Sequence, residues 1–162
     1  MPSSTTKKVL VTRFDHESLP GYVNPQTFLA QDGVEFLTQA GAVLTVPFQE
    51  IKTVCFVRDF NSSEGEIGAR QFANRPKLEG LWIRMTFRNG ELLEGVLPNN
   101  LLQIAAAGFT VIPPDPGHQK QRLFVPRAAL SEIRVLGVVG GTIKSRGRAK
   151  APAKDQIELF DR

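Results

Sequence analysis

The residues with the greatest chemical reactivity in this chain are few, and their spacing favours no catalytic site. Cys55 stands between Val54 and Phe56, an apolar setting that predicts a buried, unreactive thiol. His16 lies in a turn-like segment and His118 in a turn-rich loop, so we expect both imidazoles to be solvated. One Cys and two distant His exclude an internal disulfide and the known zinc spacings. We therefore expect no enzyme, no metal site and no cofactor.

The last residues of the chain carry the sharpest binding signal. They read Gln156, Ile157, Glu158, Leu159 and Phe160, and this pattern resembles the pentapeptide with which bacterial proteins bind the sliding clamp. In that mode a flexible tether presents Leu159 and Phe160 to an apolar pocket, while the amide of Gln156 fixes the register by hydrogen bonds. A second interpretation stays open, in which Ile157, Leu159 and Phe160 alternate as an edge strand that packs on the chain's own fold.

Basic residues precede this peptide. The net charge of the chain is +4, yet residues 1–137 hold 14 basic and 13 acidic residues, whereas residues 138–162 hold six and three. The candidates for contact with nucleic-acid phosphates are Lys144, Arg146, Arg148, Lys150 and Lys154. They favour either salt-dependent, sequence-independent binding or a solvated tether. No aromatic residue lies among them, so stacking on single strands is not favoured.

Two segments of the chain repeat one another. In chain order the aligned blocks and their offsets are Phe14 with Phe87 (73), Gly21 with Gly95 (74), residues 24–37 with 99–112 (75), and residues 44–56 with 123–135 (79). The offset only increases along the chain, as insertions at loops would produce. Collinear blocks of this kind predict two tandem copies of one structural unit.

Each copy has the pattern of five short strands, rich in apolar and β-branched residues. The predicted strands are 7–14, 19–23, 34–38, 42–47 and 51–57, then 81–87, 92–97, 109–113, 122–126 and 131–136. Asn89-Gly90 between two apolar runs predicts a type I′ hairpin turn. A Gly in each second strand, Gly21 and Gly95, predicts the sharp bend that closes a small barrel. Short helical turns are predicted after Asn24 and Asn99, ending at Gly33 and Gly108.

These elements divide the chain into four segments. The two copies span 8–58 and 81–137, and a polar, Gly-rich linker spans 59–80. Phe60 and Phe72 of the linker are expected to anchor it to the strands. From Gly137 onward the chain is rich in Gly, Ala, Pro and cations, so we expect a flexible basic tail at 138–162.

The strand pairs resemble the motif of Sm-like proteins. Residues 87–97, FRNGELLEGVL, are similar to its first half, in which a turn with Asn-Gly is followed five residues on by Gly. Residues 44–57 and 123–136 are similar to its second half, in which two short strands flank a tight corner. The resemblance implies a mostly β fold of two tandem, five-stranded, strongly bent Sm-like or SH3-like barrels with a disordered C-terminal tail. The chain is also similar to an uncharacterised bacterial family with paired barrels.

Sm-like barrels assemble into rings that bind RNA, so the resemblance implies RNA binding and homo-oligomers. The RNA-contacting residues do not match, because Leu101 stands where Asp is expected and Pro126-Arg127 where a basic pair is expected. We therefore expect a non-catalytic interaction or scaffold module that docks on a partner such as the sliding clamp. The alternative is an RNA- or DNA-binding protein. Residues 1–8 are polar, and no apolar run approaches the roughly 20 residues of a membrane span, which favours a cytoplasmic protein without membrane contact.

Overall fold

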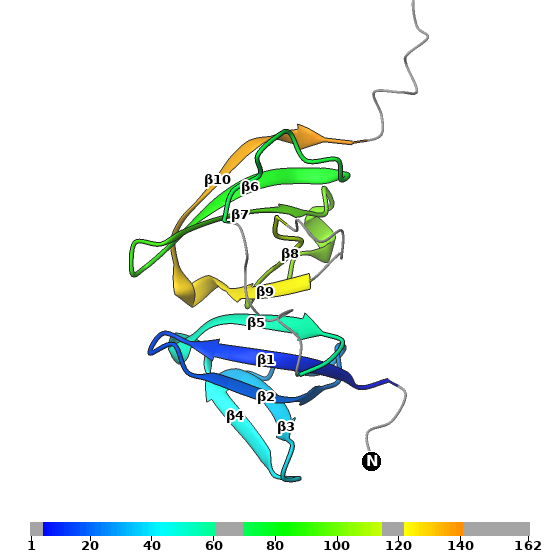
Figure 1. The fold of residues 1–162 in the computed structure, drawn as a ribbon, viewed down its shortest axis with the longest axis vertical. Coiled ribbons are helices and arrows are strands. Elements are labelled where there is room, and N and C mark those ends of the chain that lie inside the picture. The colour runs from blue at the N-terminus through cyan, green and yellow to red at the C-terminus, as the bar shows by residue number, and fades with distance from the viewer. Residues whose placement is uncertain (1–4, 61–69, 115–121, 141–162) are drawn as a thin grey trace, which may run out of the picture.

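The chain folds as antiparallel β-sheets in a computed structural model that describes residues 5–60, 70–114 and 122–140 (Figure 1). The strands are β1 (Lys7–Arg13), β2 (Ser18–Val23), β3 (Gly33–Thr38), β4 (Val43–Pro47), β5 (Ile51–Val57), β6 (Gly80–Phe87), β7 (Leu92–Leu97), β8 (Gly108–Val111), β9 (Arg122–Pro126) and β10 (Leu130–Val139). Short 3-10 turns are η1 (Phe48–Glu50), η3 (Leu101–Gln103) and η4 (Arg127–Ala129). The predicted mostly β class is thereby confirmed.

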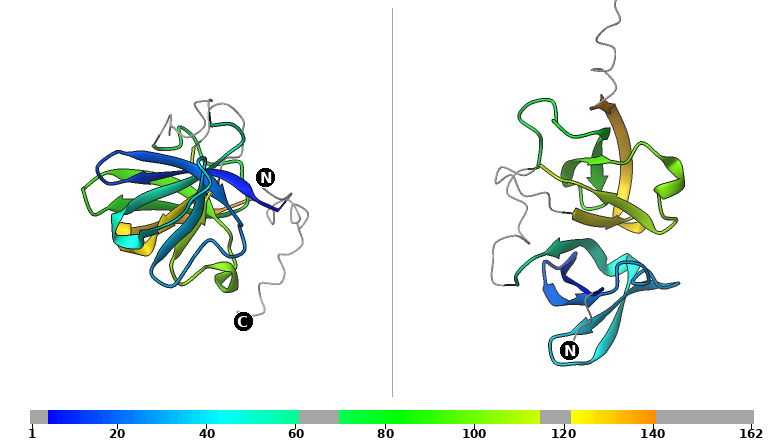
Figure 2. Two further views of the ribbon diagram at one scale, coloured as in Figure 1. Left: turned by 90° about the horizontal axis from the view of Figure 1, so that it is seen from below. Right: turned by 90° about the vertical axis from the view of Figure 1, so that its right-hand side faces the viewer.

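The strands form one large and one small sheet. The large sheet has seven strands in the order β4-β3-β2-β1-β5-β9-β8, and the small sheet has three in the order β10-β6-β7. An isolated bridge between Val96 and Ile112 links the end of β7 to the residue after β8. The right-hand view of Figure 2 shows β1–β5 and β6–β10 stacked along the long axis. They meet where β5 pairs with β9, a contact that we call the junction.

The pattern of side chains explains which strands lie at the centre. In β1, Val9 and Val11 are fully buried and alternate with half-buried residues, as in a strand with one covered face. In β5, six of seven residues are buried, because β1 and β9 flank it and both of its faces are covered. Its nearly continuous apolar sequence, IKTVCFV, fits a strand in that position.

The two cores exchange side chains across the junction. Phe124 of β9 packs in the core formed by β1–β5, where its ring lies 5.6 Å from that of Phe28 in an edge-to-face contact. Cys55 and Val57 of β5 pack instead in the core of β6–β10. Successive side chains of a strand point to opposite faces, so one pair of strands serves both cores.

The hairpin after β6 differs from the predicted type I′ turn. The Gly90 N–H donates to the carbonyl of Phe87 at 2.8 Å, which places Arg88 and Asn89 at the centre of the turn. Gly90 then follows with φ of +93°, while Asn89 keeps a negative φ. This is the three-residue hairpin loop, in which a type I turn precedes a left-handed residue.

The hairpin after β1 has the same three-residue form. His16 takes the left-handed place of Gly90, with φ of +71°. The Arg13 N–H donates to Glu17 O as the Phe87 N–H donates to Glu91 O. Matching the two hairpins by these hydrogen bonds sets Arg13 against Phe87, an offset of 74 residues, whereas the sequence alignment sets Phe14 there at an offset of 73.

Other predicted boundaries also change. Gly137, Val138 and Val139 have the composition of linker and tail, but they extend β10 because they pair with residues 80–82 of β6. The group of strands β6–β10 thus begins at Gly80 and ends at Val139. The predicted helical turns are shorter than expected: η3 ends at Gln103, and the turn after Asn24 is a single hydrogen-bonded turn to Phe28.

The expected anchors of the linker lie in contact with aromatic rings. Phe60 packs edge-to-face on Tyr22, with ring centroids 5.5 Å apart. Phe72 packs in the same manner on Trp82 of β6 at 6.5 Å. Within the linker, residues 61–69 lie outside the described residues.

A buried carboxylate fastens residues 70–72 to the small sheet. The side chain of Glu94 on β7 is 4% exposed. One of its oxygens accepts hydrogen bonds from Trp82 Nε1 and the Phe72 N–H, each at 3.1 Å, and the other accepts from Arg84 at 3.1 Å. Its backbone N–H also donates to Arg70 O at 2.8 Å. Because a buried charge is tolerated only when paired and hydrogen-bonded, Glu94 has a structural role here.

Replacing Glu94 by Leu should lower the free energy of unfolding by about 2–4 kcal/mol, because three buried or half-buried donors lose their acceptor. The measurement is urea unfolding followed by circular dichroism. Glu35→Leu is the matched control, since Glu35 is an exposed strand residue of β3. Equal decreases in the two variants would contradict the structural role of Glu94.

Candidate functional site

The site residues predicted from the sequence lie outside the described residues. This holds for the candidate peptide and for the candidate phosphate-binding cations: Gln156, Ile157, Leu159, Phe160, Lys144, Arg146, Arg148, Lys150 and Lys154. His118 also lies outside. Of the other reactive residues, Cys55 is buried at 2% exposure, as expected, and His16 is exposed in its turn, also as expected. Within the described residues, the features that could support binding or chemistry include charged groups, two of the hollows and two strand edges.

The junction contains a buried ammonium group that pairs across it. Lys52 of β5 is 7% exposed, forms an ion pair with Glu91, the residue before β7, and lies 5.3 Å from the centroid of the Phe87 ring. Arg70 lies 3.6 Å from the same Glu91 oxygen. A Lys at this depth needs a partner, and Glu91 supplies it from the other group of strands.

This pairing changes the acidity of Glu91. The hydrogen bond from Lys52 holds the pKa of the Glu91 carboxyl below its ordinary value of 4.5, and the positive charges of Lys52 and Arg70 act in the same direction. Partial burial acts to raise this pKa, but the hydrogen bond and the positive charges together have the larger effect. Glu91 therefore stays ionised at neutral pH and attracts Lys52 across the junction.

A second cation also crosses the junction. The Arg88 guanidinium stacks on the Phe14 ring at 3.9 Å, as expected for a cation–π pair. It also donates to the carbonyl oxygens of Gln49 and Ala128, the latter at 3.1 Å. These charged groups at the junction are thus engaged in holding the two groups of strands together, which favours a structural over a chemical role.

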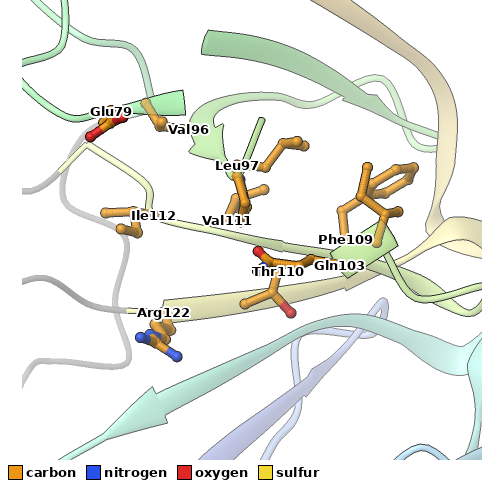
Figure 3. Close-up of a pocket in the computed structure, with 11 residues that line it drawn as sticks. Glu79, Val96, Leu97, Gln103, Phe109, Thr110, Val111, Ile112 and Arg122 are labelled. Atoms are coloured by element: carbon orange, nitrogen blue, oxygen red, sulfur yellow. The ribbon is translucent and has the colours of Figure 1, made fainter. Parts of the chain in front are cut away.

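A hollow of about 420 Å³ opens between β7 and β8, where the sheets are joined by the Val96–Ile112 bridge (Figure 3). Buried apolar side chains form much of its wall, among them Val96, Leu97, Phe109 and Val111. The charged residues Glu79 and Arg122 lie toward one end of this β7–β8 hollow in Figure 3. Nearby in the chain, Leu101 and Leu102 of η3 are 77% and 95% exposed.

A second hollow of about 510 Å³ lies beside the junction and shares Thr110 and Arg122 with the first. Three cations line this junction hollow, and they come from the beginning of β1, the residue after β5 and the beginning of β9: Lys7, Arg58 and Arg122. Phe28 and Phe56 contribute aromatic surface. No Asp or Glu is among the described residues that line it. The hollow therefore combines positive charge with apolar walls, a combination that suits an anionic ligand with a flat apolar part.

The remaining distinctive surface consists of two strand edges. On β4, Val43 and Leu44 are 63% and 45% exposed. On β10, Ile133, Val135 and Val138 are 38%, 58% and 56% exposed. Both strands lie at the end of their sheet, so their outer edges have no strand partner in the part of the chain that the structure describes.

Neither the junction hollow nor the strand edges could be predicted from the sequence. Lys7, Arg58 and Arg122 are far apart in the sequence, and it is the β1–β5–β9 pairing that brings them together. The alternation in VLTVP and LSEIRVLGVV predicts strands but gives no sign of which strand ends the sheet. Among residues 5–60, 70–114 and 122–140 there is no group of three metal-ligating side chains, and none of their helices is long and apolar enough to cross a membrane.

Removal of the Glu91 charge should destabilise the protein in a pH-dependent way. Its folded-state pKa is lowered, so its contribution to stability is complete above the unfolded-state pKa and is lost as the pH falls through the folded-state pKa. Glu91→Gln should therefore lower the free energy of unfolding at neutral pH, and this deficit should shrink as the pH falls below 4.5. Urea unfolding over a pH series measures it, with Glu35→Gln as control. A deficit that is constant with pH would refute the role of the ion pair.

Comparison with known proteins identifies a family. The model of a family of unknown function, DUF6982, matches residues 5–137, which include β1–β9 and most of β10. No curated protein and no solved structure matches the chain. Since the match spans well over half of the sequence, the chain belongs to the family of unknown function DUF6982.

Proposed function

We propose that the two groups of strands are copies of one small five-stranded barrel of the Sm-like or SH3-like type. The pairing order supports this, because β1 lies between β2 and β5 as β6 lies between β7 and β10. The register agrees as well: Val9 stands opposite Gly21, and Ile83 opposite Gly95, both at an offset of 74 residues.

Two further glycines support the same equivalence. Gly33 pairs with Pro47, and Gly108 pairs with Pro126. A Cβ atom at Gly33 would lie less than 3.0 Å from the Val46 carbonyl oxygen, and one at Gly108 would lie equally close to that of Val125. Both backbones approach their neighbour too closely for any side chain, and an identical constraint at two places argues for one unit used twice.

We further propose that the chain is a non-catalytic interaction module. The observation that carries this proposal is that seven of the eight large exposed apolar residues among the described residues lie in three groups, on β4, on β10 and on the η3 turn. Exposed apolar surface concentrated in this manner is typical of binding sites. The buried ionisable groups Lys52 and Glu94 are engaged in ion pairs that hold the fold, which favours binding over catalysis.

Within this proposal the peptide from Gln156 to Phe160 docks on a partner such as the bacterial sliding clamp. The support is the sequence pattern: a Gln that sets the register and a Leu-Phe pair that fills an apolar pocket. The barrels then act as the scaffold that carries this peptide and presents further surfaces to the same assembly.

Leu159→Ala combined with Phe160→Ala should weaken binding of the full chain to purified clamp by at least about tenfold, because the two side chains supply the apolar anchor. Fluorescence anisotropy of the labelled chain measures the dissociation constant. Asp161→Ala, just outside the pentapeptide, is the control. Equal affinity of the double variant and the wild type would exclude this docking mode.

A second candidate function is binding of nucleic acid, which the junction hollow favours. Lys7 and Arg122 can face phosphates, and the half-buried Phe56 offers apolar surface to a base. The cations of residues 144–154 would add to the affinity for nucleic acid independently of its sequence.

Replacing Lys7 and Arg122 together by Gln should weaken binding of a labelled single-stranded RNA, because two cations that can neutralise phosphates are removed. The slope of the salt dependence should fall by about one unit for each phosphate that is no longer neutralised. Electrophoretic retardation at several salt concentrations gives both values. Lys77→Gln removes an exposed cation away from the hollow and serves as the control. Absence of retardation at low salt would rule out this function.

A further inference from the structure

The junction hollow lies at one end of the core that β1–β5 form. On the neighbouring strands β1, β5 and β9, the residues buried in that core include Val9, Val54 and Phe124. Two residues further toward one end of the same strands stand Lys7, Phe56 and Arg122, which line the hollow. Alternate residues of a strand point to one face of the sheet. The hollow is therefore the place where this apolar face becomes polar and meets solvent.

Two cations at this end of the sheet are open to a ligand. Lys7 and Arg122 are exposed, and neither side chain forms an ion pair with another described residue. Their strands flank β5, so their backbones lie about 10 Å apart across the sheet, which is two strand spacings. Two long side chains can converge on one group across that separation. Arg58, the third cation of the hollow, already interacts with another group.

The charge of the hollow favours a phosphate group. No Asp or Glu is among the described residues that line it, so the charges of Lys7 and Arg122 are not neutralised there. A phosphomonoester carries a charge of about −1.5 to −2 at neutral pH, which two cations balance. The planar guanidinium of Arg122 can also donate two parallel hydrogen bonds to phosphate oxygens.

An aromatic wall stands beside these cations. Phe56 lies directly opposite Arg122 in the β5–β9 ladder and is half-buried. The ring of Phe28 packs edge-to-face on that of Phe56 with centroids 5.7 Å apart, which holds Phe56 in place. The hollow of about 510 Å³ has the size of a small-molecule site, for which about 300–1,000 Å³ is usual. Its wall thus suits a planar ring attached to the phosphate.

We propose, building on the nucleic-acid-binding role proposed above for the same hollow, that the junction hollow binds a small phosphomonoester with a planar ring, of the class of a free nucleoside 5′-monophosphate. The phosphate lies between Lys7 and Arg122, and the ring lies against Phe56. A single small ligand is favoured over a long strand because residues 1–137 hold 14 basic and 13 acidic residues. So small an excess of positive charge does not suit a long row of phosphates.

The ligand would contact both groups of strands. Lys7 and Phe56 belong to β1 and β5, whereas Thr110 and Arg122 belong to β8 and β9. Binding therefore stabilises the junction, because a bound ligand must dissociate before the two groups can separate. The temperature of unfolding should rise with the concentration of the ligand.

Isothermal titration calorimetry of the full chain tests the ligand class. Adenosine 5′-monophosphate should bind at least about tenfold more tightly than adenosine, which lacks the phosphate, because charge-assisted hydrogen bonds are lost. It should also bind more tightly than inorganic phosphate, which lacks the ring. No saturable binding of adenosine 5′-monophosphate, or an affinity equal to that of adenosine or of inorganic phosphate, overturns the proposal.

Single substitutions test the place of binding. Lys7→Gln and Arg122→Gln should each raise the dissociation constant of adenosine 5′-monophosphate at least about tenfold. Lys8→Gln is the matched control, because Lys8 follows Lys7 in β1, points to the other face and lies 5.7 Å from the Phe60 ring. Equal losses in Lys7→Gln and Lys8→Gln would show general attraction by charge and would overturn the site.

A substitution of the aromatic wall tests the ring separately. Phe56→Leu keeps an apolar side chain, so it should weaken binding of adenosine 5′-monophosphate and leave that of inorganic phosphate unchanged. Circular dichroism checks that each variant is folded. Equal affinity of Phe56→Leu and the wild type for the nucleotide contradicts the placement of the ring.

Retardation of RNA separates this proposal from the nucleic-acid-binding function. A chain that retards labelled RNA but does not bind adenosine 5′-monophosphate leaves that function standing and overturns the small ligand. A chain that binds the nucleotide but does not retard RNA at low salt supports the small ligand and rules out the function.

Discussion

The β5–β9 ladder is the contact on which the rest of the structure depends. The two groups of strands span residues 7–57 and 80–139, about 50 and 60 residues, and at this size a single core is marginal. The two groups stabilise each other, because β5 and β9 each supply side chains to both cores. If β5 separated from β9, Phe124 would leave the core of β1–β5 and Val57 would leave the core of β6–β10, so both cores would open. The two groups should consequently fold and unfold as one cooperative unit.

The junction also determines where charge and open space lie. Because β5 and β9 are flanked on both sides, the ionisable residues near them must be paired, and Lys52 with Glu91 is the result. At the beginning of β9 the ladder ends, and Arg122 stands there between the two hollows. The candidate ligand surface is thus a consequence of how two sheets are joined, and not of a local motif.

The sequence predicts local structure well and tertiary pairing poorly, for physical reasons. Alternation and β-branched residues place all ten strands to within a few residues, because these patterns act over one strand. Asn89-Gly90 gives the position of a hairpin, but not whether Asn89 adopts a positive φ, which depends on the twist of the flanking strands. Gly137 to Val139 resemble linker in composition and become strand because β6 offers them partners. The grouping of Lys7, Arg58 and Arg122 depends on pairing between distant strands, which no spacing in the sequence reveals.

The two open strand edges combine residues that hinder pairing with another strand and exposed apolar residues that favour it. Proteins that keep a sheet edge free of partners place charges, Pro or bulges along it. β4 has Pro47 at its end, and β10 carries Glu132 and Arg134, which pair with each other at 2.6 Å. Yet Val43 on β4 and Val135 on β10 are 63% and 58% exposed. Exposed apolar side chains are unfavourable on a strand edge that only contacts water. Charged residues are unfavourable on an edge that is permanently paired with another strand. Both features together suit a contact that forms and dissociates.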